Sequence, residues 1–168
     1  MAPKLEYTFT LRAYLDKDGM LGIGTVMGGP QRTVANVTRG WMEGPGLERC
    51  DIVAPTGDWL QIDPSTGSVH LDVRGHVRTK DGYAICTYYH GLMVMDPKAT
   101  KVMTFADDAK TTELGDHDFF TAPRFETSDP KLKWIENASF VGEGRFVVDE
   151  DGSTAVDYAI YRLLPGKQ

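Results

Sequence analysis

The strongest constraint on the fold is a two-residue alternation of apolar and polar side chains that recurs along the whole chain. Every second residue from Leu5 to Leu15 is apolar, which is the period of a half-buried β-strand. Residues 69–78 repeat the alternation, and their polar face carries His70, Asp72, Arg74, His76 and Arg78. The segment "VANVTRGWMEG" continues with β-branched and aromatic residues up to a Gly-Pro-Gly break. The chain therefore predicts many short strands separated by turns.

Two pairs of strands are close enough in sequence to form hairpins. "SVHLDVRGHVRT" and "YAICTYYHGLMVM" flank "KDG", and "ASFVGEGRFVV" and "TAVDYAIYRLL" flank "DEDGS". Gly82 fits the left-handed position of the first turn. A three-residue loop there places Arg74 opposite Tyr88 and Asp72 opposite His90. A two- or four-residue loop instead brings Tyr89 to that face, because a slip of one residue exchanges the faces of a strand.

Helical signals are scarce. Only "DPKLKWIENA" and "DDAKTTELGDHDF" predict a short helical piece each. Strands at such short spacing indicate an antiparallel barrel or sandwich, and we favour the barrel because closure removes exposed edges and encloses a cavity. We expect an all-β fold: a single antiparallel β-barrel domain over residues 1–168, with an internal ligand cavity and at most short helical turns.

The amino-acid composition limits the classes of molecule that the protein is expected to bind. The formal net charge is -6, which disfavours nucleic acid and anionic membranes, since both attract basic surfaces. No apolar run is long enough to span a bilayer, and the N-terminal residues alternate instead of forming the apolar block of a signal peptide. Cys50 and Cys86 lie in strand-like contexts, where reduced thiols are expected in an intracellular protein. These features predict a cytoplasmic location.

Several segments together resemble one known family. They are Arg32, "WMEGPGL" (41–47), "GDW" (57–59), "LDVRGHVRTKDGYAI" (71–85) and "FFTAPRFETSDPKLKWIENASFVGEGR" (119–145). They are similar to the barrels of domain-of-unknown-function family 3237 (DUF3237), over nearly the whole chain. The resemblance implies a single β-barrel with an open interior. The family often has an arginine where this chain has Met93, and that change makes the strand end more apolar.

One fungal branch of that family is identified with phenalenone biosynthesis in the herqueinone pathway. The resemblance to it implies a cyclase that performs intramolecular hydroalkoxylation, closing a dihydrofuran ring on a prenylated aromatic polyketide. Such a reaction is of the lyase or isomerase type, involves no redox change and needs no cofactor. The expected partner is a small aromatic substrate, and the sequence leaves a homo-oligomer open. The alternative is a non-catalytic barrel that binds or carries a small aromatic metabolite; a purely structural subunit is a third option.

The predicted position of the active site depends on whether the polar face of residues 69–78 points into the barrel or towards solvent. Periodicity alone favours a solvated outer face, but a tyrosine reaches the Asp-Arg pair in every hairpin register, and the family resemblance favours a cavity lining. The catalytic candidates are then Arg32, Asp72, Arg74 and Tyr89. The substrate-binding candidates are Trp59, Tyr88, His90, Met93, Arg124 and Glu126.

The reaction assigns roles to these candidates. A buried carboxyl, Asp72 or Glu126, would donate the proton because burial disfavours its charged form. Tyr88 or Tyr89 would relay the proton, and guanidinium groups would hold the phenol oxygen. For Arg32 and Arg124, structural salt bridges with Glu43 or Glu126 are equally consistent with the sequence. His70 and Asp72 could converge on a metal, but no third ligand is well placed, so no metal site is predicted.

Overall fold

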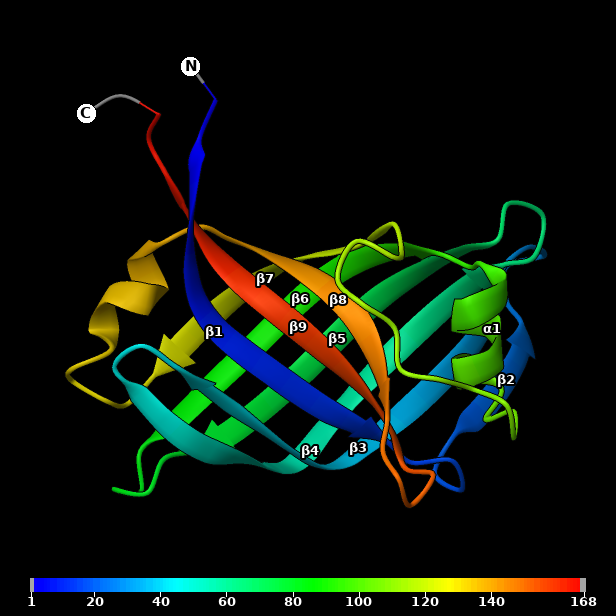
Figure 1. The fold of residues 1–168 in the computed structure, drawn as a ribbon, viewed down its shortest axis with the longest axis horizontal. Helices are drawn as coiled ribbons and strands as arrows, with labels where there is room; N and C mark the ends of the chain where they lie inside the picture. Colours follow the sequence, from blue (N-terminus) through cyan, green and yellow to red (C-terminus); the bar gives the residue numbers. More distant parts are fainter. Residues whose placement is uncertain (1, 167–168) are drawn as a thin grey trace.

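The computed structural model describes residues 2–166 and consists mostly of strands (Figure 1). The elements within this range are β1 (Lys4–Leu15), β2 (Leu21–Thr25), β3 (Gln31–Gly44), β4 (Leu47–Asp63), β5 (Ser68–Arg78), β6 (Ala84–Val94), α1 (Pro97–Met103), β7 (Phe119–Thr127), the 3₁₀ helix η1 (Lys133–Asn137), β8 (Phe140–Val148) and β9 (Thr154–Leu164).

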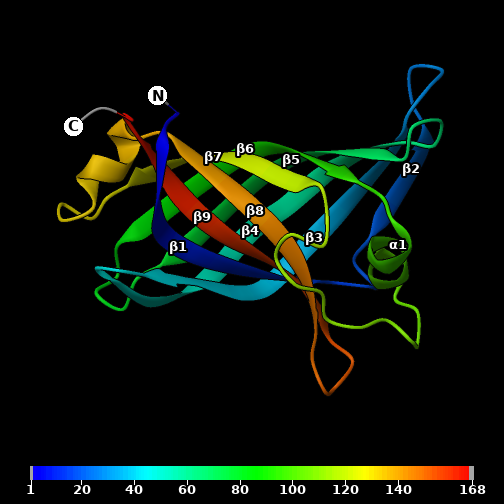
Figure 2. The ribbon, with the colours of Figure 1, turned by 45° about the horizontal axis from the view of Figure 1, so that its top comes forward.

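Eight of the strands close into a barrel. Antiparallel neighbours run in the order β1-β9-β8-β7-β6-β5-β4-β3, and β3 pairs again with β1. β2 lies outside the ring as a hairpin partner of β3, visible beside α1 at one end of the barrel (Figure 2). The predicted all-β antiparallel barrel is confirmed. Within the described residues, no helix is long and apolar enough to cross a membrane.

Both predicted hairpins form. Gly82 has a φ of 87°, and the β5–β6 register places Arg74 opposite Tyr88 and Asp72 opposite His90, the pairing expected for a three-residue loop. Gly152 has a φ of 81° in the turn between β8 and β9, a conformation that glycine adopts at little cost.

The helices agree only in part with the sequence. η1 lies inside "DPKLKWIENA" as predicted, but the helical piece expected in residues 107–119 is wrong, since residues 107–118 form turns, bends and coil and Phe119 begins β7. α1 was not predicted from the sequence. Its start is signalled by Asp96, whose side chain accepts hydrogen bonds from the backbone N–H groups of Lys98 and Ala99, and by Pro97 in the first turn.

Aromatic side chains fill the barrel near its two ends. Phe9, Phe125 and Phe140 form a buried cluster with ring centroids 5.1 to 6.5 Å apart. Trp134 of η1 packs against Phe140 at this end. Towards the α1 end, Phe119 packs against Phe146. Each buried ring contributes about 1.5–3 kcal/mol by its removal from water.

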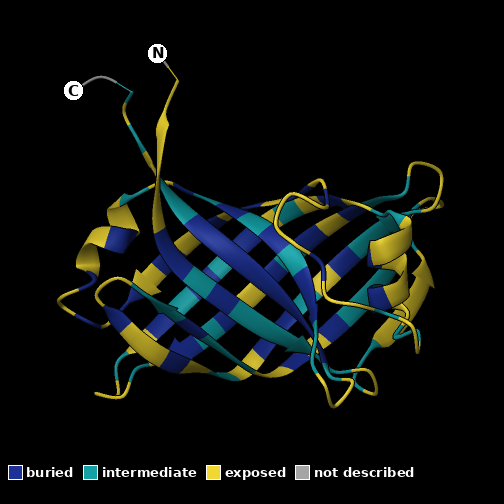
Figure 3. Cartoon of the chain, viewed as in Figure 1, coloured by how far each residue is buried: buried dark blue, intermediate teal, exposed yellow. Residues whose placement is uncertain are grey.

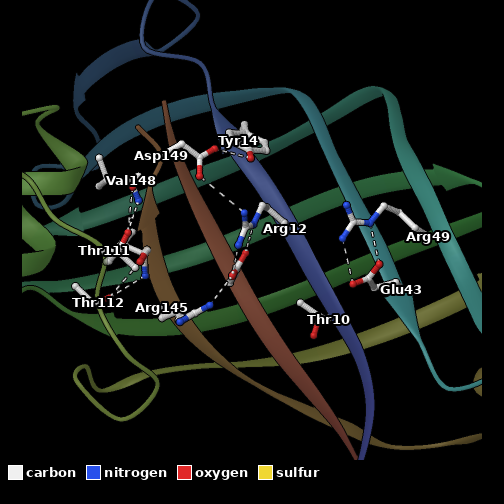
Figure 4. A network of polar contacts seen from close by, with 12 residues as sticks. Thr10, Arg12, Tyr14, Glu43, Arg49, Thr111, Thr112, Arg145, Val148 and Asp149 are labelled. Atoms are coloured by element: carbon white, nitrogen blue, oxygen red, sulfur yellow. Dashed lines mark hydrogen bonds and ion pairs between the residues drawn. The ribbon is translucent and has the colours of Figure 1, made fainter. Parts of the chain in front are cut away.

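Charged side chains on the outer face of the barrel form ion pairs that link β1, β8 and β9. Arg12 donates two hydrogen bonds to Asp157, at 2.6 and 2.8 Å, and Arg145 donates one to the same carboxylate at 3.2 Å. Arg12 also lies 3.9 Å from Asp149, which accepts a hydrogen bond from Tyr14 (Figure 4). The buried Asp157 carboxylate is therefore fully compensated by two guanidinium groups on neighbouring strands.

Candidate active site inside the barrel

The polar face of β5 points away from the barrel interior. Val69, Leu71, Val73 and Val77 are buried, while the alternate residues lie outside, as the banded pattern of exposure in Figure 3 illustrates. The side chains of Asp72 and Arg74 are 42% and 50% exposed and form an ion pair at 3.4 Å. The prediction that this face lines the cavity is wrong. Burying the two guanidinium groups of this face would cost free energy unless each found a charged or polar partner. Burying the aliphatic face instead gains free energy, so the aliphatic side chains face inward.

Most of the other candidates also lie outside. His90 is 76% exposed and 3.8 Å from Asp72, and Arg74 lies over the ring of Tyr88. Arg32 donates a hydrogen bond to the backbone oxygen of Trp59 at 2.6 Å, and Trp59 itself is 42% exposed.

Arg124 and Glu126 lie on the outer face of β7, beside Tyr88 in a surface groove. In the described chain neither Arg32 nor Arg124 forms a salt bridge with Glu43 or Glu126. Glu43 pairs with Arg49 instead. The structure thus places eight of the ten sequence-predicted residues outside the barrel. Only Tyr89 and Met93 are buried inside it.

The interior holds a cavity of about 60 Å³, and of the sequence-predicted site residues only Tyr89 and Met93 line it. Its wall is built from aliphatic and aromatic side chains of eight strands and the end of α1. The polar residues that line it are Thr56, Asp58, His76, Thr87, Tyr89 and Tyr158. No lysine or arginine is among the lining residues in the described part of the chain. Asp58 is the one carboxyl among the lining residues there, and it lies in largely apolar surroundings.

Strand pairing places Asp58 on the inner wall. It pairs with Ala35 of β3 and Val73 of β5, both of which are buried. Its Oδ1 accepts a hydrogen bond from the backbone N–H of Asp72 at 2.9 Å. Burial raises the pKa of Asp58 to about 7; the negative charge of Asp72 acts in the same direction, while the Asp72 N–H and the positive charge of Arg32 oppose it. This carboxyl can therefore hold or release a proton near neutral pH.

Two tyrosines face the same cavity from other strands. Tyr89 of β6 and Tyr158 of β9 are buried and meet edge to face, with ring centroids 5.5 Å apart. Burial raises the pKa of both phenols, and the charge of Asp58 contributes to each shift. Both phenols therefore stay protonated and can donate hydrogen bonds to a bound molecule.

Thr87 adds a hydroxyl without a partner. Thr87 is only 4% exposed, and its Oγ1 has no hydrogen-bond partner in the described chain. Because an unpaired buried hydroxyl is costly, this position fits a site that a ligand completes. The geometry combines an acid of near-neutral pKa, phenol donors and a largely apolar wall, and such a combination is suited to general acid–base catalysis on an apolar molecule.

Asp58 could have been found from the sequence. Along "DWLQID" (58–63), Leu60 and Ile62 share one strand face with Asp58, and Trp59, Gln61 and Asp63 share the other. If the aliphatic pair faces inward, Asp58 must do so too. The large aromatic surface of Trp59 obscured that signal.

Comparison with known proteins agrees with this architecture. The family model described as "Protein of unknown function (DUF3237)" matches residues 3–163. A UPF0311 protein of Clostridium acetobutylicum is 28% identical over 139 residues, covering 81% of this chain and 82% of that protein.

Three solved structures show the same fold. A conserved protein of unknown function from Rhodopseudomonas palustris has a TM-score of 0.79 and 21% identity, covering 98% of this chain and 99% of that one. A β-barrel-like protein from Acinetobacter baumannii has a TM-score of 0.73 and 23% identity, covering 97% of each chain. An enzyme from Penicillium herquei has a TM-score of 0.60 and 14% identity, covering 97% of this chain and 96% of that one. By its match to the family model, the chain belongs to the DUF3237 family.

Proposed function

We propose that this DUF3237 protein is an acid–base enzyme that acts on a small, largely apolar aromatic molecule held in the barrel. The specific reaction proposed is cofactor-independent intramolecular hydroalkoxylation, the closure of a dihydrofuran ring on a prenylated aromatic polyketide such as a phenalenone. The observation that carries the proposal is the Asp58 carboxyl, which lines a largely apolar cavity and has a pKa of about 7. A barrel of this fold from Penicillium herquei is described as an enzyme, which supports catalysis in the same scaffold.

Asp58 takes the role first given to Asp72. Its protonated carboxyl donates the proton to one alkene carbon, and the phenol oxygen bonds to the other. The phenol proton then returns to the Asp58 carboxylate, so the product is an isomer of the substrate and no electrons are exchanged. General acids positioned in this way contribute about 10²–10⁴-fold to a rate.

The neighbouring residues orient the substrate. The hydroxyl groups of Tyr89 and Tyr158 hold the phenol oxygen, and Met93 packs against the apolar part of the ligand. The largely apolar wall disfavours the entry of water, which would otherwise capture the cationic carbon. Because the cavity measures about 60 Å³, the proposal places the alkenyl group beside Asp58 and the ring system nearer the surface.

A reaction in deuterated water tests this proposal. Purified protein and a prenylated phenalenone should yield one enantiomer of the cyclised product, with one deuterium on the former alkene carbon. Asp58→Asn should lower turnover by about 10²-fold or more, while Glu126→Gln on the outer face should leave it unchanged. Racemic product at the background rate, or full activity of Asp58→Asn, would refute acid catalysis by this residue.

The same experiment addresses the alternative of a binding or carrier barrel. The partnerless Thr87 hydroxyl in the cavity wall is compatible with ligand storage as well as with catalysis. A carrier would retain the phenalenone and return it chemically intact, whereas the proposed enzyme would release the ring-closed isomer.

A further inference from the structure

The barrel wall at Asp58 is thin enough for charges on its outer side to act on the cavity. The backbone N–H of Asp72 lies 2.9 Å from Asp58 Oδ1. Since the Asp72 carboxylate is attached to that same residue, covalent geometry keeps it within roughly 8 Å of Asp58. Two opposite faces of one wall thus bring two carboxyl groups close together.

The Asp72 carboxylate is only partly neutralised by its surroundings. Arg74 lies 3.4 Å away and His90 3.8 Å away, both on the outer face. Asp72 Oδ1 is buried yet receives no hydrogen bond within the described chain. This oxygen faces Arg74 and His90 on the outer side of the sheet, and because it is buried, the solvent screens its negative charge less than that of a fully exposed carboxylate.

Arg32 supplies the opposite charge from the other neighbouring strand. It lies on β3 and donates a hydrogen bond to the backbone oxygen of Trp59 at 2.6 Å. Trp59 directly follows Asp58, so this hydrogen bond holds the guanidinium group against the outer side of β4, next to the residue that carries the carboxyl. β5 and β3, which flank β4, thus contribute charges of opposite sign.

The remaining groups around Asp58 come from inside the barrel. Tyr89 and Tyr158 face it from β6 and β9, and His76 reaches the cavity lining from β5, although it alternates with the buried Gly75 and Val77 and its ring lies on the outward face. The tyrosines are neutral near pH 7, and His76 is held by a contact of 2.8 Å between its Nδ1 and the backbone oxygen of Pro55. The strands that flank β4 thus carry Asp72 on β5 and Arg32 on β3 next to Asp58.

We propose that Asp72 and Arg32 are positioning residues that act through the barrel wall and set the pH at which Asp58 releases its proton. Asp72 makes proton release harder, Arg32 makes it easier, and Arg74 moderates Asp72 through their ion pair. The outer cluster thereby adjusts the acid to neutral conditions without touching a ligand. This inference rests on the proposed role of Asp58 in catalysis, but it concerns an equilibrium that is measurable without substrate.

The test is an NMR titration of the aspartate side-chain carboxyl carbons, with the Asp58 signal assigned by its loss in Asp58→Asn. Asp72→Asn should lower the pKa of Asp58 by about 0.5–1.5, the range expected for one charge at this separation. Arg32→Gln should raise it by a similar amount. Arg74→Gln should also raise it and serves as a second variant if one of the others fails to fold. Glu126→Gln, on β7, should leave it unchanged.

Shifts of opposite sign distinguish charge coupling from a general structural disturbance, which would move all variants in one direction. Loss of the shifts in concentrated salt would agree with coupling through partly exposed charges. An unchanged Asp58 titration in folded Asp72→Asn and Arg32→Gln would overturn the inference. If the titration shifts as expected but no cyclised product forms, the proposed function fails and the coupling stands.

Discussion

Asp58→Asn should make the protein more stable at neutral and alkaline pH. The carboxyl has an ordinary pKa of 3.8, which burial raises to about 7 in the folded chain. Between these values the unfolded chain loses the proton while the folded chain keeps it, so folded-state stability falls as the pH rises. Below pH 4 both states are protonated and the penalty vanishes; above pH 7 it is complete. Asparagine does not titrate and is free of this penalty.

The magnitude follows from the two pKa values. The difference between 3.8 and about 7, at 1.36 kcal/mol for each pKa unit, corresponds to about 4 kcal/mol. Because Asp58 is only partly buried, this figure is an upper bound. Asparagine retains an Oδ1 that can accept the hydrogen bond from the Asp72 N–H, so the substitution removes the charge and keeps the contact.

Urea unfolding at several pH values measures the effect. The difference in unfolding free energy between Asp58→Asn and the wild type should be near zero at pH 4 and grow to a few kcal/mol by pH 8. Glu126→Gln, which changes an exposed carboxyl on the outer face, should show no such growth. Parallel stability curves for Asp58→Asn and the wild type would show that Asp58 titrates normally, and the reasoning about the cavity would fall with it.

Two further predictions concern other parts of the molecule. Arg12→Ala should lower the unfolding free energy by about 2–4 kcal/mol, because it leaves the buried Asp157 carboxylate with only Arg145; urea unfolding of the variant checks this, and a loss below 0.5 kcal/mol would contradict it. A thiol reagent should modify Cys86 in the native protein well before Cys50, which is buried and whose pKa burial raises to about 11; equal labelling rates would contradict the assigned burial.

The fold was predictable because alternation and turn chemistry act locally. The hairpin around Gly82 follows from its turn residues and strand period, and the pairing of Arg74 with Tyr88 is the register expected for a three-residue loop, one of the loop lengths left open by the sequence. α1 escaped because seven residues are too few for a clear helical period, and its signal is confined to the Asp96–Pro97 start.

The local sequence pattern could not decide which face of each strand points into the barrel. Tyr88 and Tyr89 are consecutive, so β6 presents a tyrosine to each side whatever the register. A tyrosine beside the Asp-Arg pair therefore carried no information about which side was inside. The difference in burial energy between the two faces does contain this information. Burying Arg74 and Asp72 costs free energy, whereas burying Val73 and Leu71 gains it, so the charged face is correctly predicted to point outward.

The location of the acid follows from the same energetic rule. A barrel buries its apolar faces, so a polar strand face marks the exterior, and chemistry inside must come from a single polar residue on an otherwise apolar face. Asp58, in line with Leu60 and Ile62, is such an exception. Its cost is tolerated because the Asp72 N–H and the proton on its own carboxyl reduce the buried charge. The charged residues that the sequence made conspicuous then matter through their position behind Asp58, where Asp72 and Arg32 can act on it across the wall.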